Sequence, residues 1–413
     1  MNRRCFLFGA AGLAAGLVEA QDRRGLRAGA AVVEITPSLT RPVYLAGFGQ
    51  NRRATGVHDP LYARALVLEA GGERLAIVAL DLIGLFHQHV QAIRKRIHAL
   101  PGERVIIVCT HVHSGPDTLG LWGPNEWETG VDPHYLRLLQ DRIVAAVEKA
   151  ARRLRPVGLQ VGSRPIPEGV AYNAREPIQD PDVTALRFID RRARTVATLV
   201  HFGCHPEVMS DSGTLITADY CGPALKRVEK RLGGVGLFIN GALGGMVTPQ
   251  ISGSTWAEVT RVGEMVGNTA VAALEGRPTV DVAGLGFASR QVRIPLENEN
   301  LRALAVAGVI VGPPQNDEMV TEVCRLDLGP VRAITLPGEV LPKPALELKR
   351  AIGADVSLVV ALGNDELGYI LDPADYSRTL YRHERRMSVG PQAWPRLRAA
   401  AGELLASRMN ECK

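Results

Sequence analysis

The chain has 413 residues, of which 46% are hydrophobic and 22% are charged, so it is long enough and apolar enough to bury a substantial core. This composition excludes a disordered or fibrous protein. The formal net charge is only +5, and part of it lies near the N-terminus in Arg3, Arg4, Arg23 and Arg24. Because no dense stripe of Lys and Arg with interleaved aromatic residues follows, we expect no nucleic-acid partner.

The first residues, MNRRCFLFGAAGLAAGLVEAQ, place adjacent arginines before an apolar run from Phe6 to Val18. This pattern is typical of an export signal, and Arg3 and Arg4 followed by Phe-Leu resemble the bacterial twin-arginine type. The alternative is an ordinary secretory or membrane-anchoring segment, although a run of roughly 13 apolar residues is short for a bilayer span. We therefore predict an export signal at residues 1–20 and a periplasmic or extracellular location.

The six cysteines form no CxxC motif and no dense framework, so a disulfide scaffold is not expected. Most of them are predicted to be small buried hydrophobic residues. Cys109 and Cys204 lie close to histidines in the sequence, which leaves a thiolate metal ligand open as an alternative.

Apolar runs alternate with amphipathic stretches after the export signal. A first strand is predicted at residues 26–37, and a strand at 75–81, a helix up to residue 100 and a strand from residue 105 then form a βαβ unit, which requires parallel strands. After a helix at 139–154, residues 183–190 and 195–205 flank a polar turn, as in an antiparallel hairpin. The predicted sheet is therefore mixed and partly parallel.

The remaining chain continues the alternation, with no internal repeat or low-complexity linker. Further elements are predicted at residues 223–232, 236–240, 256–274, 284–294, 331–339, 345–352 and 357–365, and in a closing helix after Pro391. The predicted fold class is α/β. It is a single large domain with a mixed, partly parallel sheet flanked by helices and a metal site at the carboxyl ends of the strands.

The stretch CTHVHSGPD places His111 and His113 one residue apart, directly after an apolar strand. Residues i and i+2 of an extended segment face the same way, so both imidazoles can address one point. That spacing suits a metal, or one metal ligand beside a proton shuttle, whereas the structural alternative is two polar residues that cap the next loop. Gly115 and Pro116 stand where a metallo-β-lactamase-like site would carry Asp and His, and an amidohydrolase-type HxH would open the first barrel strand, so both patterns fit poorly.

Three further polar groups follow predicted apolar strands in the same way. They are His205 in HFGCHPEV, Glu339 in LPGEV and Tyr369 in GNDELGYI, and Asp219 in TADYCGP is expected either to orient a ligand His or to position a loop. Taken singly, a residue like Glu339 is more often a helix N-terminal carboxylate and one like Tyr369 a packing residue. Their common position after strands predicts that they converge on one cleft.

Several motifs in matching order resemble the catalytic domain of the neutral/alkaline, non-lysosomal ceramidases, over about Arg27 to Pro391. The most specific is THVHSGP, and it is followed by FGCHPEVMS, LITADYCGP, FINGALGGMVTP, LPGE and GNDELGYI with DYSRTLY. The resemblance implies a short bacterial member of the family. It also implies one catalytic domain over residues 26–410. The chain is expected to depart from the family in having no C-terminal immunoglobulin-like domain after Pro391.

The same resemblance implies a single zinc ion held by His111, His205, Glu339 and Tyr369. It further implies that His113 is the acid or base beside the metal and that Arg175, in YNAREP, holds the substrate. Zinc suits a ligand set of nitrogen and oxygen, although these ligands alone would not exclude another divalent metal.

The chain departs from the family pattern at two places that matter for the site. In GGMVTP the aspartate of the family's glycine loop is lost and Thr248 stands in place of its serine, so we expect attack by water with Thr248 as a positioning group. Glu366 stands where the family has another tyrosine, whereas Tyr376 and Tyr381 keep the family's spacing, which favours Tyr369 as the ligand.

Together these residues predict an exported zinc-dependent amidohydrolase that cleaves the N-acyl amide bond of a ceramide-like lipid by metal-activated water. The alternatives are a zinc hydrolase of the same fold acting on a non-lipid amide or an ester, and a non-catalytic binding protein. Trp122 and Trp127 are expected either to line an apolar cleft or simply to pack a long loop. Peripheral membrane contact is compatible with this reading, and the oligomeric state is left open.

Overall fold

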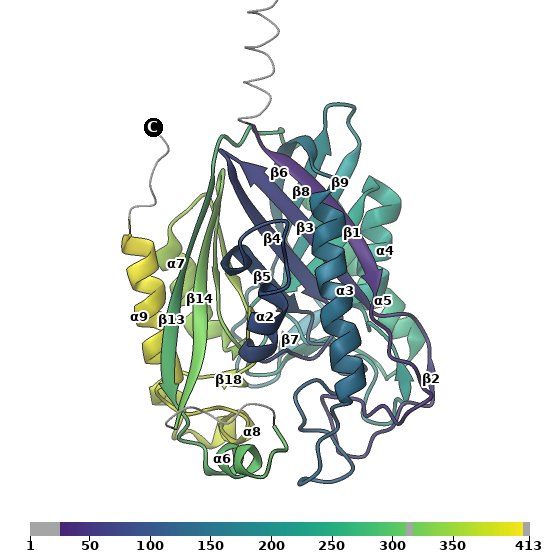
Figure 1. Cartoon of the computed structure of the whole chain (residues 1–413), viewed down its shortest axis with the longest axis vertical. Helices are drawn as coiled ribbons and strands as arrows, with labels where there is room; N and C mark the ends of the chain where they lie inside the picture. Colours follow the sequence, from purple (N-terminus) through teal and green to yellow (C-terminus); the bar gives the residue numbers. More distant parts are fainter. Residues whose placement is uncertain (1–24, 311–316, 408–413) are drawn as a thin grey trace, which may run out of the picture.

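A large mixed sheet forms the first layer of the computed structural model, which describes residues 25–310 and 317–407 (Figure 1). Strands β11 and β9, and β4 and β5, pair in parallel, while the remaining neighbours pair antiparallel. The predicted βαβ unit and the predicted hairpin are therefore both confirmed. In sheet order the strands are β11 (Val235–Asn240), β9 (Thr195–Phe202), β8 (Asp182–Asp190), β6 (Arg155–Pro165), β1 (Arg27–Glu34), β3 (Tyr62–Ala70), β4 (Glu73–Leu80) and β5 (Val105–Cys109).

A second sheet of four strands packs against the first. Leu66 and Ile77 of the large sheet share a buried cluster with Leu326 and Leu358 of this second sheet, so the two sheets bury their facing surfaces against each other. This sheet was not predicted as separate from the first, and the strand at residues 318–328 was not predicted. In order the strands are β13 (Leu285–Pro295), β14 (Glu318–Leu328), β15 (Val331–Thr335) and β17 (Val356–Val360).

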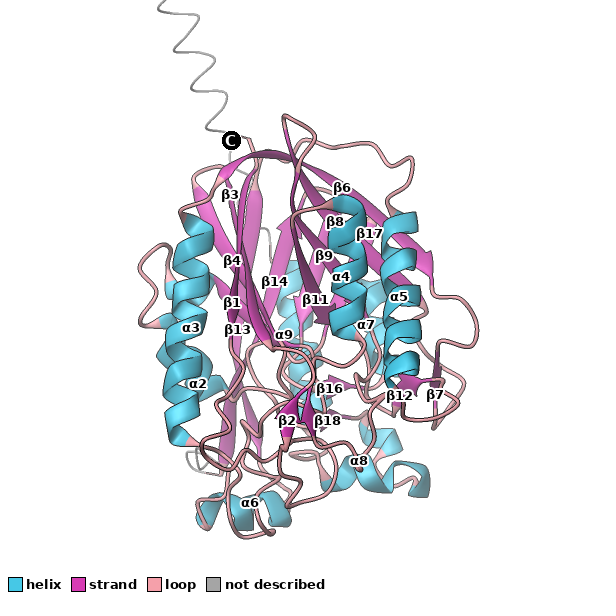
Figure 2. Ribbon diagram, turned by 90° about the vertical axis from the view of Figure 1, so that its right-hand side faces the viewer, coloured by secondary structure: helices cyan, strands magenta, loops and turns pink. Residues whose placement is uncertain are grey.

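Helices cover the outer faces of both sheets (Figure 2). The long helix α3 begins where the Asp132 carboxylate accepts a hydrogen bond from the His134 amide, and its apolar stripe packs on β1 and β3. The fold class is as predicted, an α/β domain with a large mixed sheet flanked by helices. The main helices are α2 (His87–Arg94), α3 (Pro133–Ala151), α4 (Cys221–Leu232), α5 (Trp256–Ala273), α7 (Pro342–Ile352) and α9 (Ala393–Ala406).

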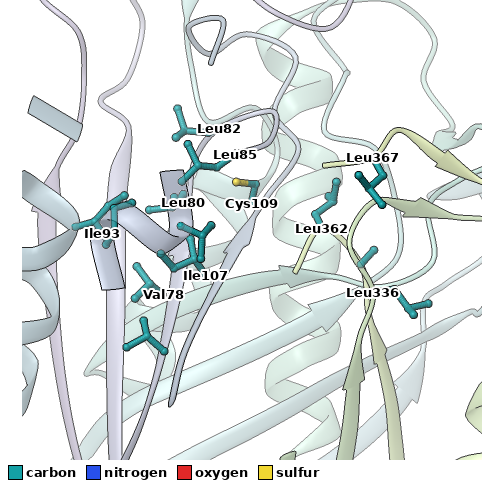
Figure 3. Close-up of a cluster of buried hydrophobic side chains, with 14 of the residues drawn as sticks. Val78, Leu80, Leu82, Leu85, Ile93, Ile107, Cys109, Leu336, Leu362 and Leu367 are labelled. Atoms are coloured by element: carbon teal, nitrogen blue, oxygen red, sulfur yellow. The ribbon is translucent and has the colours of Figure 1, made fainter. Parts of the chain in front are cut away.

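A hydrophobic cluster joins the two sheets near the ends of their strands (Figure 3). Ile107 and Cys109 of β5 contribute to it from one side, and Leu336, Leu362 and Leu367 contribute from the chain that follows β15 and β17. Each fully buried side chain of this kind contributes roughly 1.5–3 kcal/mol to stability. The cluster therefore fixes the segments that carry the polar residues described below.

Two asparagines connect strands that are distant in the sheet order. The large sheet curls so that β11 contacts β5, and the Asn240 side-chain amide at the end of β11 donates a hydrogen bond to the Thr110 carbonyl. Asn364 joins the second sheet to the same strand. Its side-chain oxygen accepts a hydrogen bond from the Ile107 backbone amide at 2.7 Å, and its backbone amide donates one to the Ile107 carbonyl at 2.7 Å. The end of β5 is thus tied to both sheets.

Short elements and loops gather at the end of the molecule where β5 and β9 finish (Figure 1). No helix of the described residues is long and apolar enough to cross a membrane, and the predicted export signal at residues 1–20 lies outside the described residues. The short elements are β2 (Gly56–Val57), β7 (Ala171–Asn173), β10 (Leu215–Ile216), β12 (Val247–Pro249), β16 (Glu339–Val340), β18 (Tyr369–Ile370), α6 (Glu299–Val306) and α8 (Arg382–Arg386), with 3-10 turns at Gly102–Arg104, Pro373–Asp375 and Thr379–Tyr381.

Candidate metal centre

His111 lies two residues beyond β5, in the left-handed backbone region with φ 65°. Its amide donates to the Leu82 carbonyl at 2.9 Å, and its Nδ1 lies 2.7 Å from the Ile83 carbonyl oxygen. Because a carbonyl can only accept, Nδ1 carries the proton and the Nε2 lone pair of the neutral ring points the other way. That Nε2 lies 3.4 Å from Oε2 of Glu339.

His205 follows β9 and is held in the same manner. Its amide and its Nδ1 both point to the Val247 carbonyl oxygen, at 2.8 Å and 2.9 Å, and its Nε2 lies 2.9 Å from the same Oε2 of Glu339. Histidine ligands of metals usually engage a carbonyl or carboxylate with their other ring nitrogen, which fixes the tautomer and the ring orientation. The structure therefore brings His111, His205 and Glu339 together with their ligating atoms on one point.

Tyr369 is the fourth residue for which the resemblance implies a role as metal ligand. Its strand β18 pairs with β16 so that Tyr369 lies directly beside Glu339. The phenol lies 3.4 Å from the Met246 sulfur, and burial together with Glu339 holds its pKa well above the ordinary value. Met246 belongs to the GGMVTP loop, so this loop reaches the phenol through its methionine.

The electrostatics of this cluster fit a bound cation. Burial alone would lower the pKa of His205, but the hydrogen bond to Glu339, the charges of Glu207 and Glu339 and the contact with the Val247 carbonyl together raise that pKa to about 9. Burial would raise the pKa of Glu339, yet the two histidines hold it well below the usual range. Two imidazole lone pairs and a carboxylate directed at one buried point suit zinc, which favours nitrogen and oxygen ligands and displaces protons when it binds.

His113 lies beside these candidate ligands, with its ring centroid 5.0 Å from that of His111 and 5.6 Å from that of His205. The ligating atoms of these three histidines lie within 4.8 Å of one another, so His113 is close enough to be a third nitrogen ligand or a proton carrier. Neither of its ring nitrogens has a hydrogen-bond partner among the described residues, although Nδ1 lies 3.4 Å from Oε2 of Glu207. Burial and the two neighbouring histidines lower the pKa of His113 well below the ordinary value. The ring is therefore neutral at pH 7 in the metal-free protein.

Several residues that were not predicted from the sequence hold His113 in place. The guanidinium of Arg52 donates to the carbonyls of His113 and Ala46, and the Phe48 ring packs edge-on against the imidazole. A Cβ at Gly47, where φ is 99°, would lie 2.3 Å from the His113 ring, so only glycine fits there. No spacing rule links the segment at residues 46–52 to His113, and only the tertiary structure brings them together.

The cluster opens into a cavity of about 610 Å³. Trp122 and Trp127 both line it, which favours the cleft-lining interpretation over simple loop packing. Trp122 is half-buried and its indole N–H donates to the Phe48 carbonyl, whereas Trp127 is 61% exposed. This volume is in the range of small-molecule sites, and the wall is mainly apolar. Besides the polar cluster, the wall includes Ile83, Phe86, Leu119, Leu121, Leu296, Leu301, Leu304, Met319, Leu367 and Val389.

Thr248 and Arg175 are not among the residues that line this cavity. Thr248 lies opposite Tyr172 in the β7–β12 ladder. Neighbouring residues of a strand face opposite sides, and the Val247 side chain is buried in the core, so the Thr248 side chain faces away from the core. Arg175 pairs through Nε with Oε1 of the fully buried Glu384 at 2.7 Å. The catalytic role assigned to Thr248 and the substrate role assigned to Arg175 therefore stay predictions that this placement does not support.

Asp219 positions a loop rather than a histidine. Its carboxylate accepts hydrogen bonds from the amides of Val208, Met209 and Tyr220, which fixes the segment just after His205. Asp117, the last residue of CTHVHSGPD, works in the same way by accepting from the amides of Leu119, Gly120 and Trp122. Cys109 and Cys204 are buried free thiols whose pKa values burial raises well above the ordinary value, which disfavours the thiolate alternative.

Comparison with solved structures places this fold among the ceramidases. The crystal structure of neutral ceramidase from Pseudomonas aeruginosa matches with a TM-score of 0.77 at 20% sequence identity, covering 93% of this chain and 75% of that one. A structure described as ceramidase complexed with C2 matches with a TM-score of 0.76 at 19% identity, covering 92% and 75% of the two chains. At this identity the likeness shows the fold.

The sequence comparisons define the family. The model of the neutral/alkaline non-lysosomal ceramidase N-terminal region matches residues 27–255, more than half of the chain, so the chain belongs to this family. It is 28% identical over 196 residues to a neutral ceramidase of Pseudomonas aeruginosa, covering 42% of this chain and 29% of that protein. It is 26% identical over 215 residues to a neutral ceramidase of Mycobacterium tuberculosis, covering 46% and 34%. The matched stretches thus span about a third of these relatives' own length.

Proposed function

We propose that this protein is a zinc-dependent amidohydrolase that releases the fatty acid from an N-acyl amide lipid of the ceramide type. The observation that carries the proposal is the pair of histidine Nε2 atoms, of His111 and His205, that flank one buried oxygen of Glu339 beside an apolar cavity. Membership of the ceramidase family supports the same reaction. An apolar cavity suits an acyl chain, because burying each methylene of the chain contributes roughly 0.8 kcal/mol.

When bound at this point, zinc supplies a Lewis acid that polarises a carbonyl and lowers the pKa of water. The residues of the chain supply the rest. Neutral His113 accepts the proton of the attacking water and returns it to the amine nitrogen, which is a poor leaving group until it is protonated. An acyl chain that fills the cavity would exclude bulk water from the cluster and strengthen each of these polar interactions.

Hydrolysis is tested with a ceramide that carries a label in its acyl chain. We expect the purified protein to release labelled fatty acid, to lose this activity on chelation and to recover it on addition of zinc. Short acyl amides and acyl esters provide the comparison panel, and His98→Ala, at an exposed histidine, provides the control variant. Release from esters alone would overturn the proposed amide substrate.

We also propose that the protein is exported through its N-terminal segment. The support is the adjacent Arg3 and Arg4 before an apolar run, a pattern read by twin-arginine export. Replacing both arginines with lysine keeps the charge, so we expect the protein to shift from the exported fraction to the cytoplasmic fraction. An unchanged distribution would show that another route carries the chain.

A further inference from the structure

Glu207 is a carboxylate beside His113 that has no role in the steps given above. Its Oε2 lies 3.4 Å from Nδ1 of His113, and the exposed fractions of the two side chains are only 9% and 8%. Burying a carboxylate is costly unless a donor is close to it. The N–H of the imidazole is in position to supply that donor.

The backbone holds Glu207 and His113 next to each other. The His113 amide donates to the carbonyl of Pro206, the residue before Glu207, at 3.2 Å. On the other side of Glu207, the amides of residues 208 and 209 donate to the Asp219 carboxylate at 3.2 Å and 3.0 Å. The carboxyl is therefore carried by a segment that is fixed both before and after it.

Arg52 joins the same two segments through its side chain. Its guanidinium donates to the His113 carbonyl from Nη2 and to the Ser210 carbonyl from Nη1, the latter at 3.3 Å. The imidazole is confined on a further side, because a Cβ at Gly47 would lie only 2.6 Å from Nδ1 of His113. The contact between Nδ1 and the carboxylate thus belongs to a rigid arrangement.

The partner of Nδ1 decides what the other ring nitrogen can do. A carboxylate only accepts hydrogen bonds, so Nδ1 carries the proton when it faces Glu207, and Nε2 of the neutral ring keeps its lone pair. The other tautomer would present an N–H at Nε2 and could not accept a proton there. His113 lies in the cluster with His111 and His205, so its tautomer determines whether it can take a proton from water at this site.

We propose that Glu207 is the positioning residue of His113: it accepts the Nδ1 proton and thereby keeps Nε2 free to receive the proton of the attacking water. This inference rests on the proposed function in using His113 as the proton carrier. Glu207 is not among the residues that line the cavity, so it acts through the imidazole and not on the substrate. The separation of 3.4 Å is longer than a formed hydrogen bond, as is common for catalytic pairs before a substrate binds.

The tautomer of His113 is measured by NMR of the zinc-loaded full chain with ¹⁵N-labelled histidine at neutral pH. The signal of the ring is identified by its loss in His113→Ala. We expect Nδ1 to be protonated and Nε2 to be bare in the wild type, and Glu207→Ala to shift the ring toward the Nε2-protonated form. The matched control Glu264→Ala, at an exposed glutamate on α5, should keep the wild-type tautomer. An Nε2-protonated ring in the wild type, or an unchanged ring in Glu207→Ala, overturns the proposal.

Turnover of the labelled ceramide provides the second readout. Glu207→Ala should lower kcat by roughly 10- to 100-fold, a part of what general acid–base catalysis contributes, while KM stays within about twofold. Glu207→Gln keeps the shape of the side chain, and in both variants turnover should follow the fraction of rings with a bare Nε2. Unaffected turnover in a variant whose ring has changed tautomer, or a fall in zinc content, overturns the positioning role.

Thermal unfolding confirms that each of these variants is folded. If the folded, zinc-loaded wild type cleaves no amide, the proposed function fails. The NMR measurement still decides whether Glu207 sets the tautomer of His113, so the two failures are distinguishable.

Discussion

Glu322 and Glu339 are both buried glutamates that join the two sheets, yet their surroundings are opposite in kind. One oxygen of Glu322 accepts from Nη2 of Arg94 at 2.6 Å and from the amide of Asn364 at 2.7 Å. Glu339 instead faces the imidazoles of His111 and His205. The first carboxylate is balanced by a permanent cation, whereas the second is paired with imidazoles whose charge depends on pH and which could share a metal with it.

The largest effect is expected from the histidine beside the ligand set. Replacing His113 with Ala removes the proposed proton carrier, so turnover should fall by roughly 100- to 10,000-fold. Zinc content, measured by metal analysis of the purified variant, should stay at one ion per chain. Loss of zinc together with turnover would instead make His113 a metal ligand.

The balanced glutamate should govern stability rather than chemistry. Glu322→Ala leaves the Arg94 guanidinium buried without its carboxylate, which should lower the free energy of unfolding by about 3–5 kcal/mol in denaturant titration. Replacing both residues with apolar ones of similar volume should restore most of that loss. If the double replacement is no more stable than Glu322→Ala, the guanidinium is not the source of the cost.

The metal site should respond to removal of one ligand by weaker zinc binding. The free energy of zinc binding at structural sites is about 10–16 kcal/mol, to which all the ligands contribute. Loss of one ligand in His205→Ala should therefore weaken the zinc affinity about 100-fold or more. Competition with a chelator of known affinity measures the change. The matched change His98→Ala, at an exposed histidine, should leave the zinc affinity as it is.

A smaller effect is expected from pH. Glu339 raises the pKa of His205 to about 9 in the metal-free protein, so below that pH zinc must displace a proton from His205. Apparent zinc affinity should therefore fall by about tenfold for each unit of pH below 9, because one proton is released per zinc bound. A zinc affinity that is flat between pH 6.5 and 8.5 would show that His205 is already neutral without metal.

Local patterns were sufficient to predict the elements around His111 and His205. The apolar run before His111 is strand β5, and its parallel pairing with β4 followed from the helix between them. The second sheet was not separable because β14 (Glu318–Leu328) mixes charged and apolar residues, including Glu322 and Arg325, which are buried by partners distant in sequence. Periodicity cannot reveal burial of that kind.

The residues of the candidate site were likewise predictable only in part. The resemblance placed His111, His205, Glu339 and Tyr369 together, and the structure brings them together. Thr248 and Arg175 were matched by position in the sequence alone, and side-chain direction along β12 and the ion pair with Glu384 lead them elsewhere. Glu366 could be recognised from the sequence only as a departure from a motif, because its burial in the cavity wall, with Oε2 lacking a hydrogen-bond partner among the described residues, becomes visible only in three dimensions.

Strands β16 and β18 pair beside the ends of β5 and β9, and this position affects how readily the two sheets separate. Residues 111 and 205 follow strands of the large sheet, and residues 339 and 369 follow strands β15 and β17 of the second sheet, so an ion bound by all four would hold the two layers together. Zinc at 100 times its dissociation constant adds about 2.7 kcal/mol to such a fold. The chelated protein should therefore be cut faster by a protease at the seam between the sheets than the zinc-loaded protein is.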